Sequence, residues 1–242
     1  MPAMTDKTFK DLQSDPDDRA FHAMAARVQP YTMTMREGPE AAYALFQAVR
    51  YVVQNKIPGA IAECGVWRGG SMMLAALGLK HFGDMEREFF LYDTYEGMTR
   101  PEDVDVDYDG ASMKQAWSEA QRAGKAIGYG GAVETVRSYL KTTGYPMEKM
   151  HFVAGDVLET IPKILPGAIA VLRLDTDWYK STLHELTHLY DVLSPGGVLI
   201  IDDYGWCRGA RQATDEFFGG RDFKPLMQRL NQGARLIIKH WS

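Results

Sequence analysis

Apolar residues are arranged along this chain in short continuous runs that alternate with longer stretches of helical spacing. Five runs have the length and β-branched content of buried parallel strands: 60–64, 88–92, 150–154, 168–174 and 197–201. Helical spacing is found over 39–54, 72–79, 133–141 and 182–193. Two further runs, 225–230 and 235–239, flank an Asn-Gln-Gly turn. The pattern predicts an α/β fold, a Rossmann-like, doubly wound sheet of seven strands that ends in an antiparallel C-terminal hairpin.

The organisation of the 242 residues is that of one domain without repeats or linkers. We expect residues 1–30 to be a polar, loosely helical extension and residues 31–242 to form the domain. The polar stretch 98–131, with apolar islands such as 113–117, predicts a mobile lid that carries a helix. This lid contains an acidic series that could be a second metal patch, but it lacks the glycine and the final glutamate of an EF-hand loop and is interpreted as a solvated face: Asp103, Asp105, Asp107 and Asp109.

Three aspartates follow two of the predicted strands. Asp175 comes after the run 168–174, and Asp202 and Asp203 come directly after the run 197–201. Parallel strands bring such residues to the same rim of a sheet, where open α/β sheets place their ligands. Clustered carboxylates need a positive charge between them, and an all-oxygen set suits a hard cation such as Mg²⁺. The alternative is helix capping by Asp175 or Asp177 and a turn at Asp203, and the spacing alone does not decide between the two.

A glycine-rich turn, 65–71, connects the first strand to a helix. Such a turn lets the backbone approach a ligand and exposes the N–H groups of the helix N-terminus, although tight turns need glycine for other reasons too. The residues match neither the dinucleotide fingerprint nor a phosphate P-loop. Asp93 ends the second strand, where an acidic side chain can accept hydrogen bonds from ribose hydroxyls. Together the turn and Asp93 predict a nucleotide-type ligand.

Four segments carry a resemblance to a known family: 61–71, 92–98, 172–182 and 194–205. They resemble, in the same order, the macrocin, mycinamicin and demethyldecarbamoylnovobiocin O-methyltransferases, and the resemblance runs from about 31 to 217. These are class I enzymes that use S-adenosylmethionine and Mg²⁺ to methylate sugar hydroxyls of antibiotics. The resemblance therefore implies an O-methyltransferase whose acceptor is a small molecule, with S-adenosylmethionine and Mg²⁺ as cofactors. The chain departs from the common pattern in the acidic lid and at Trp178 and Trp206, which concerns the acceptor rather than the reaction.

The resemblance also implies roles for individual residues. Residues of the first turn would line the methionine part of the cofactor: Glu63, Cys64, Gly65, Val66, Gly69 and Ser71. Asp93 would hold the ribose, Thr94 would also bind the cofactor, and Gly155 and Asp156 would border the adenine. Asp175, Asp202 and Asp203 would bind the metal, with Asp175 also acting as the general base. Aromatic residues just beyond the carboxylates are predicted to form a wall for the acceptor, although burial in the core is an equal alternative for the first: Trp178, Tyr179, Tyr204 and Trp206.

The segment 184–188 matches the zinc-hydrolase pattern H-E-x-x-H, in which His184 and His188 would hold zinc and Glu185 would activate water. The helix is expected to connect two strands, with its leucines on the sheet and its histidines on a flank. Without a convincing third ligand, a zinc hydrolase is the disfavoured alternative.

Composition narrows the partners and the compartment. The formal charge is −5 without a Lys/Arg-rich run, so we expect no nucleic-acid partner. The two cysteines, Cys64 and Cys207, are too few for a disulfide framework. The start of the chain lacks a leader pattern and no segment approaches 18 apolar residues, so we expect a cytoplasmic protein without membrane contact, which could form a homodimer or higher homo-oligomer.

Two other classes share the predicted sheet and cofactor. A catechol-type or phenolic O-methyltransferase would differ in its acceptor, and the resemblance around 67–68 and 202–203 favours the antibiotic-sugar enzymes. A noncatalytic S-adenosylmethionine-binding module would not need the three aspartates.

Overall fold

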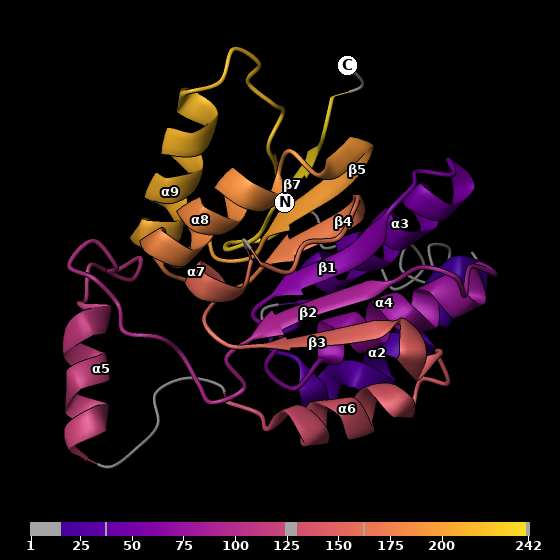
Figure 1. Cartoon of the computed structure of the whole chain (residues 1–242), viewed down its shortest axis with the longest axis horizontal. Coiled ribbons are helices and arrows are strands. Elements are labelled where there is room, and N and C mark those ends of the chain that lie inside the picture. Colours follow the sequence, from indigo (N-terminus) through magenta and orange to yellow (C-terminus); the bar gives the residue numbers. More distant parts are fainter. Residues whose placement is uncertain (1–15, 37, 124–129, 162, 241–242) are drawn as a thin grey trace, which may run out of the picture.

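The central feature of the computed structural model, which describes residues 16–36, 38–123, 130–161 and 163–240, is a seven-stranded sheet of order β3-β2-β1-β4-β5-β7-β6 (Figure 1). The strands are β1 (Ala60–Cys64), β2 (Phe89–Asp93), β3 (Met150–Ala154), β4 (Ile169–Leu174), β5 (Leu193–Ile201), β6 (Gln228–Arg229) and β7 (Arg235–Ile238). β1 to β5 are parallel, and β7 pairs antiparallel with both β5 and β6. The predicted α/β fold, with its doubly wound sheet and closing hairpin, is confirmed.

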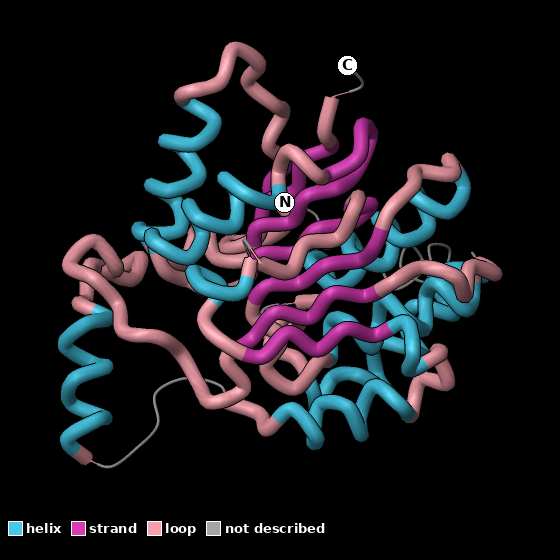
Figure 2. The backbone as a smooth tube through the Cα atoms, in the orientation of Figure 1, coloured by secondary structure: helices cyan, strands magenta, loops and turns pink. Residues whose placement is uncertain are grey.

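Helices cover both faces of the sheet. One face carries α2 (Pro16–Val28), α3 (Glu40–Gln54), α4 (Gly70–His81) and α6 (Val133–Lys141), and the other carries α7 (Val157–Thr160), α8 (Tyr179–Leu189) and α9 (Arg208–Gly219). Short 3-10 helices span Gln29–Tyr31 and Met147–Lys149. In Figures 1 and 2, α5 (Met113–Arg122) lies to one side of the sheet, at the end of a long loop.

Alternating residues of each strand supply the two cores. In β1, Ile61 faces the side of α3 and α4, whereas Ala62 faces the side of α8. In β4, Val171 and Leu172 divide in the same way. This period of two is the reason that the strands read as continuous apolar runs, since both faces are buried.

The same alternation brings two charged residues into the interior. Glu63 lies two residues after Ile61 and Arg173 two residues after Val171, so both share the face of α3 and α4. The register between β1 and β4 pairs Glu63 directly with Arg173. A buried carboxylate and a buried guanidinium therefore meet near the C-terminal ends of the two central strands.

Helices α7 and α9 were not predicted, and α2 is better formed than the expected extension. Residues 16–28, expected to be part of a loosely helical extension, form α2, which buries Phe21, Ala25 and Val28 in the core. α9 supplies Ala213 and Phe218 to the opposite side of the molecule. Residues 1–15 of the predicted extension and residues 124–129 of the predicted lid lie outside the described residues. No helix in the described part of the chain is long and apolar enough to span a membrane.

Candidate functional site

A cavity of about 520 Å³ opens at the C-terminal ends of the parallel strands, a volume within the range of small-ligand pockets. Most of the residues predicted from the sequence line it: Gly65, Val66, Ser71, Asp93, Thr94, Gly155, Asp156, Asp175, Trp178, Asp202, Asp203 and Trp206. Five predicted residues do not line it, namely Glu63, Cys64, Gly69, Tyr179 and Tyr204. Segments far apart in the sequence thus meet in one place.

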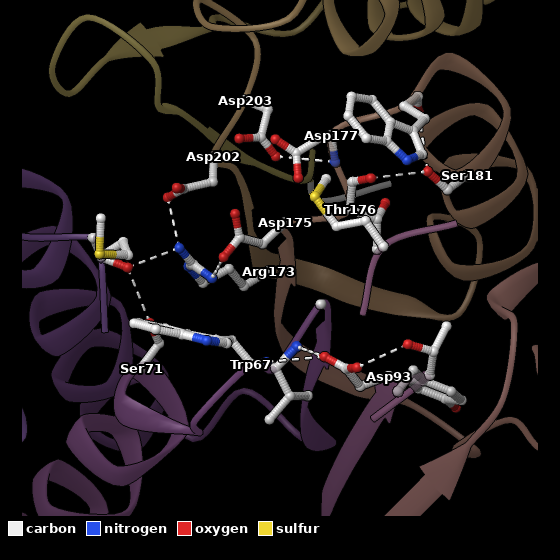
Figure 3. Close-up of a pocket in the computed structure, with 18 of the residues that line it drawn as sticks. Trp67, Ser71, Asp93, Arg173, Asp175, Thr176, Asp177, Ser181, Asp202 and Asp203 are labelled. Atoms are coloured by element: carbon white, nitrogen blue, oxygen red, sulfur yellow. Dashed lines mark hydrogen bonds and ion pairs between the residues drawn. The ribbon is translucent and has the colours of Figure 1, made fainter. Parts of the chain in front are cut away.

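Asp93 holds the glycine-rich turn together. Its Oδ2 accepts hydrogen bonds from the backbone N–H groups of Val66 (2.6 Å) and Trp67 (2.9 Å), as Figure 3 shows for Trp67. Its Oδ1 accepts from the N–H of Tyr95 at 2.6 Å. The carboxylate that was predicted to bind a ribose therefore also fixes the turn that would hold the rest of the ligand.

The glycines of the turn are required by close backbone packing. A Cβ atom on Gly65, whose φ is +85°, would lie 2.0 Å from the carbonyl oxygen of Asp175, and one on Gly70 would lie 2.5 Å from the backbone of Tyr31. Gly69 adopts φ +81° as the residue before α4. Neither contact involves a ligand, so these glycines alone are no evidence of one.

Arg173 is the positive charge between the carboxylates. Its side chain is only 2% exposed, and its Nη1 lies 2.8 Å from Glu63 Oε1 and 2.6 Å from Asp175 Oδ2. Its Nη2 lies 2.7 Å from Asp202 Oδ1 (Figure 3). The compensating charge expected from the sequence was a metal ion, and the position of Arg173 two residues before Asp175 was the signal for this arginine.

A hydroxyl network ties Arg173 to the N-terminal part of the chain. Arg173 Nη2 donates a hydrogen bond to Thr34 Oγ1 at 2.8 Å. The Thr34 and Ser71 hydroxyl oxygens are 3.1 Å apart, and Thr32 donates to Thr34 at 2.9 Å. Because 31–34 also line the cavity, the segment between α2 and α3 closes one side of the site.

The three predicted metal ligands come together. One carboxylate oxygen from each of Asp175, Asp202 and Asp203 lies within 4.8 Å of the others, and no other such group of three or more His, Cys, Asp or Glu occurs within the described ranges. Asp202 Oδ1 is buried and accepts no aligned hydrogen bond, despite its nearness to Arg173. Burial and the repulsion of Asp177 and Asp202 raise the pKa of Asp203 well above its usual range. Such a set of oxygens, short of positive charge, is chemically suited to a divalent cation.

Asp177 belongs to this cluster and was missed as a functional residue. It lines the cavity with a left-handed φ of 64°, and its backbone N–H donates to Asp203 Oδ2 at 3.2 Å. Burial, followed by the repulsion of Asp175 and Asp202, raises the pKa of Asp177 to about 8. The capping alternative is wrong for this helix, because Trp178 is the N-cap of α8 and no side chain caps it.

Only two of the four residues predicted to form an aromatic wall line the cavity. Trp178 is 3% exposed and donates from its indole N–H to the carbonyl of Thr99, so it both lines the cavity and is part of the packing. Trp206 lines the cavity with Tyr108, and their ring centroids are 5.1 Å apart. Tyr179 and Tyr204 instead donate their hydroxyls to Glu216 and Asp215, away from the cavity lining.

One of the four lid aspartates contradicts the prediction of a solvated face. Asp105 is 1% exposed, and it accepts hydrogen bonds from the backbone N–H of Tyr179 (2.8 Å) and of Glu102 (2.7 Å). A Cβ atom on Gly209 would lie 1.9 Å from Asp105 Oδ1. Asp105 therefore anchors the start of the lid between α8 and α9, whereas Asp103 is exposed and pairs with Lys114.

The H-E-x-x-H segment does not have the arrangement of a zinc-hydrolase site, in which two histidines hold the ion and the glutamate lies beside it. Glu185 is fully buried and accepts a hydrogen bond from Thr176, while His184 and His188 are only partly buried, with ring centroids 4.1 Å apart. His188 Nδ1 contacts the backbone carbonyl of His184. Among the described residues, no third ligand joins the pair.

Comparison with known proteins identifies the family. The model of the macrocin O-methyltransferase (TylF) family matches residues 4–235. The chain belongs to this family. Demethyldecarbamoylnovobiocin O-methyltransferase of Streptomyces niveus is 33% identical over 171 residues, which are 71% of this chain and 62% of that protein. Mycinamicin III 3''-O-methyltransferase of Micromonospora griseorubida is 32% identical over 174 residues, 72% of this chain and 65% of that protein. The match thus spans somewhat less than two thirds of these macrocin-family relatives.

A solved structure supports the assignment of the fold. The structure of the O-methyltransferase NovP is 27% identical with a TM-score of 0.73, and the alignment covers 87% of this chain and 82% of that one. The seven-stranded class I methyltransferase fold is therefore common to both.

Arg173 should be essential for stability. Arg173→Met leaves the buried carboxylate of Glu63 and the half-buried carboxylates of Asp175 and Asp202 without their shared partner, so the free energy of unfolding should fall by about 3–5 kcal/mol near neutral pH. Adding Glu63→Gln to that variant removes one of the stranded charges and should restore part of the loss. Denaturant unfolding of both variants measures this, and an Arg173→Met protein as stable as wild type would contradict the role assigned to the guanidinium.

Proposed function

We propose that this protein transfers the methyl group of S-adenosylmethionine to a hydroxyl of a small-molecule acceptor, with a Mg²⁺ ion bound by Asp175, Asp202 and Asp203. The observation that carries the proposal is the position of this carboxylate cluster across one cavity from the glycine-rich turn and Asp93. Family membership supports the reaction, since the relatives are named O-methyltransferases.

The cavity suits S-adenosylmethionine in its polar groups. The first turn of α4 contributes Gly70 and Ser71, and Asp93 still has acceptor capacity beside the three backbone N–H groups that it binds. Gly155 and Asp156, after β3, line the same cavity on the side proposed for the adenine. The bound cofactor supplies an electrophilic methyl group, and these residues would bind and orient it.

The carboxylate cluster suits Mg²⁺ because it offers oxygen donors only, one of them buried without an aligned hydrogen bond. Held by these carboxylates, Mg²⁺ would lower the pKa of an acceptor hydroxyl and orient it. Arg173, which also pairs with Glu63, holds Asp175 and Asp202. Two of the proposed ligands are thereby kept in place, while Asp203 makes no ion pair with the arginine. The arginine would thus orient the ligands.

Two aspartates are placed to accept the proton of the acceptor hydroxyl. Asp175 is the base suggested by the family resemblance, but Arg173 binds one of its oxygens. Asp177 also lines the cavity, and its pKa of about 8 is that of a carboxyl that readily takes up a proton. We propose Asp175 as ligand and base and keep Asp177 as the second candidate for the base.

The acceptor would bind between the cluster and the aromatic side chains Trp178, Trp206 and Tyr108. Such surfaces stack against sugar rings or aglycones. A relative from Streptomyces olivaceus, 35% identical over 171 residues, is named for a 4'-O-methylation of a rhamnosyl tetracenomycin. We therefore propose a sugar hydroxyl of a glycosylated natural product as the acceptor, and assays should compare rhamnosides with catechols.

Asp93→Ala tests the cofactor site. The variant loses the hydrogen bonds to the ribose and loosens the turn at Val66 and Trp67, so binding of S-adenosylmethionine should weaken by about 1–3 kcal/mol. Titration calorimetry gives the affinity directly. Asp103→Ala, at an exposed lid position, is the matched control and should bind as wild type does; equal affinity of the Asp93 variant would refute the assignment.

The requirement for a metal and the identity of the base are tested separately. Removal of divalent ions with EDTA should abolish methyl transfer and Mg²⁺ should restore it, whereas His188→Ala should change neither activity nor metal content.

Asp175→Asn should keep its affinity for S-adenosylmethionine and lose about 10²–10⁴ in turnover, which high Mg²⁺ does not rescue, whereas Asp203→Asn should be partly rescued. Full rescue of Asp175→Asn by Mg²⁺ would make it a plain ligand, and a larger loss in Asp177→Asn would move the base there.

Cation binding should depend on pH. Because the pKa of Asp177 is raised from 3.8 to about 8, its contribution to the stability of the cation-free protein is complete below pH 3.8 and is lost as the pH rises through about 8. The ion favours the charged carboxylates, so its binding should release protons and tighten between about pH 6 and pH 8. Calorimetry of Mg²⁺ binding in buffers of different ionisation enthalpy detects the protons, and a pH-independent affinity would contradict the prediction.

A further inference from the structure

Glu185 is a buried carboxyl that the proposed mechanism does not use. It lies in the middle of α8 and is fully buried, and its only hydrogen bond among the described residues is from the hydroxyl of Thr176 to Oε1 at 2.8 Å. Its Oε2 is buried without a partner. Burial raises the pKa of Glu185 to about 8. A leucine or methionine would fill such a position at lower cost, so the carboxyl calls for a physical reason.

The partner of Glu185 lies in the turn that carries the candidate active-site aspartates. Thr176 is placed between Asp175 and Asp177, at the point where the chain leaves β4 and enters α8. The two neighbouring aspartates belong to the carboxylate cluster, whereas the Thr176 hydroxyl is bonded to Glu185 in the interior. Figure 3 shows Thr176 between the cluster and Ser181 of α8.

The backbone of this turn is unfavourable, and several contacts hold it in place. Asp177 has a φ of 64°, a backbone angle that residues other than glycine seldom adopt. The carbonyl of Thr176 accepts from Trp178 N–H at 2.7 Å and from the Ser181 hydroxyl at 3.3 Å. The N–H of Asp175 donates to the carbonyl of Cys64 and that of Asp177 to Asp203, so these hydrogen bonds attach the turn to β1 and to the residues after β5. The hydrogen bond from Thr176 to Glu185 attaches the same strained turn to α8.

We propose that Glu185 is a positioning residue, which holds the Thr176 hydroxyl and thereby fixes the 175–178 turn in the conformation that places Asp175 and Asp177 beside Asp202 and Asp203. The inference rests on the proposed function of that cluster. It also gives the glutamate of the H-E-x-x-H segment a role that requires neither histidine.

Glu185→Met is the deciding variant, because methionine fills the space of the carboxyl but cannot accept from Thr176. Replacing a buried polar group by an apolar one of similar volume is neutral or stabilising, so the variant should unfold no more easily than wild type. Its turnover should nevertheless fall about 10- to 100-fold, and its affinity for Mn²⁺, measured by electron paramagnetic resonance without acceptor, should fall about tenfold. Glu185→Gln, whose amide oxygen can accept from Thr176, should stay within about twofold of wild type in both.

Two further variants connect the effect to Thr176. Thr176→Val removes the hydroxyl, and the double variant Glu185→Met/Thr176→Val should be no worse than the more damaged single variant, because both remove the same hydrogen bond. His188→Ala, one turn further along the same helix, is the control for general disturbance of α8 and should match wild type. Affinity for S-adenosylmethionine should remain within about threefold in all of them, since the residues proposed to bind it follow β1, β2 and β3 rather than β4.

The outcomes separate this inference from the proposed function. A Glu185→Met protein with wild-type turnover and Mn²⁺ affinity, while Asp175→Asn loses both, would overturn the role of Glu185 alone. If Asp175→Asn also behaves as wild type, the proposed function fails. Hydrogen exchange of the Asp175 and Trp178 amides then decides whether Glu185 positions the turn. Faster exchange of these amides in Glu185→Met supports the positioning role, and unchanged exchange overturns it.

Discussion

The buried guanidinium of Arg173 is the interaction on which the site depends. It contacts Glu63 at the end of β1, Asp175 after β4 and Asp202 after β5, and through Thr34 it reaches the segment before α3. Without it, the strand ends would bring together carboxylates that repel one another in a medium of low polarity. Arg173 therefore joins the elements of the site and sets its charge, and the fold can tolerate an acidic rim at the centre of its sheet because of it.

One arginine does not neutralise the whole cluster. Asp203 and Asp177 lie on the side of the site away from Glu63, make no ion pair with Arg173, and have raised pKa values because burial and neighbouring carboxylates disfavour their charged forms. These two carboxyl groups line the cavity, where the proposed divalent ion and acceptor hydroxyl would bind. Arg173 thus fixes Asp175 and Asp202, whereas Asp203 and Asp177 are left without an ion pair to it.

Much of this could be predicted from the sequence because strands have a period of two and parallel strands end at a common rim. The strand positions, the hairpin and the meeting of Asp175, Asp202 and Asp203 all follow from that rule. The position of Arg173 in the interior follows from the same period, but its partners depend on register, which the sequence does not give. Asp105 and α2 were misjudged because their burial comes from elements distant in sequence, α8 and α9 in one case and α3 and α4 in the other. Composition alone makes both look exposed.

The proposed acceptor side of the site was least predictable, for a related reason. Groups proposed for the chemistry are attached to strand ends, whose positions the sheet determines, whereas the wall facing them is assembled from Met98, Thr99 and Tyr108 of the lid together with Trp178 and Trp206. The segment predicted as a lid is held by contacts with elements distant in sequence, notably that of Asp105 with the start of α8 and the pairing of Asp107 with Cys207. Changes in those contacts would move Tyr108 against Trp206 and reshape the wall without moving a carboxylate. A fold of this kind can therefore keep one reaction while its acceptor changes, because the two are attached to different parts of the chain.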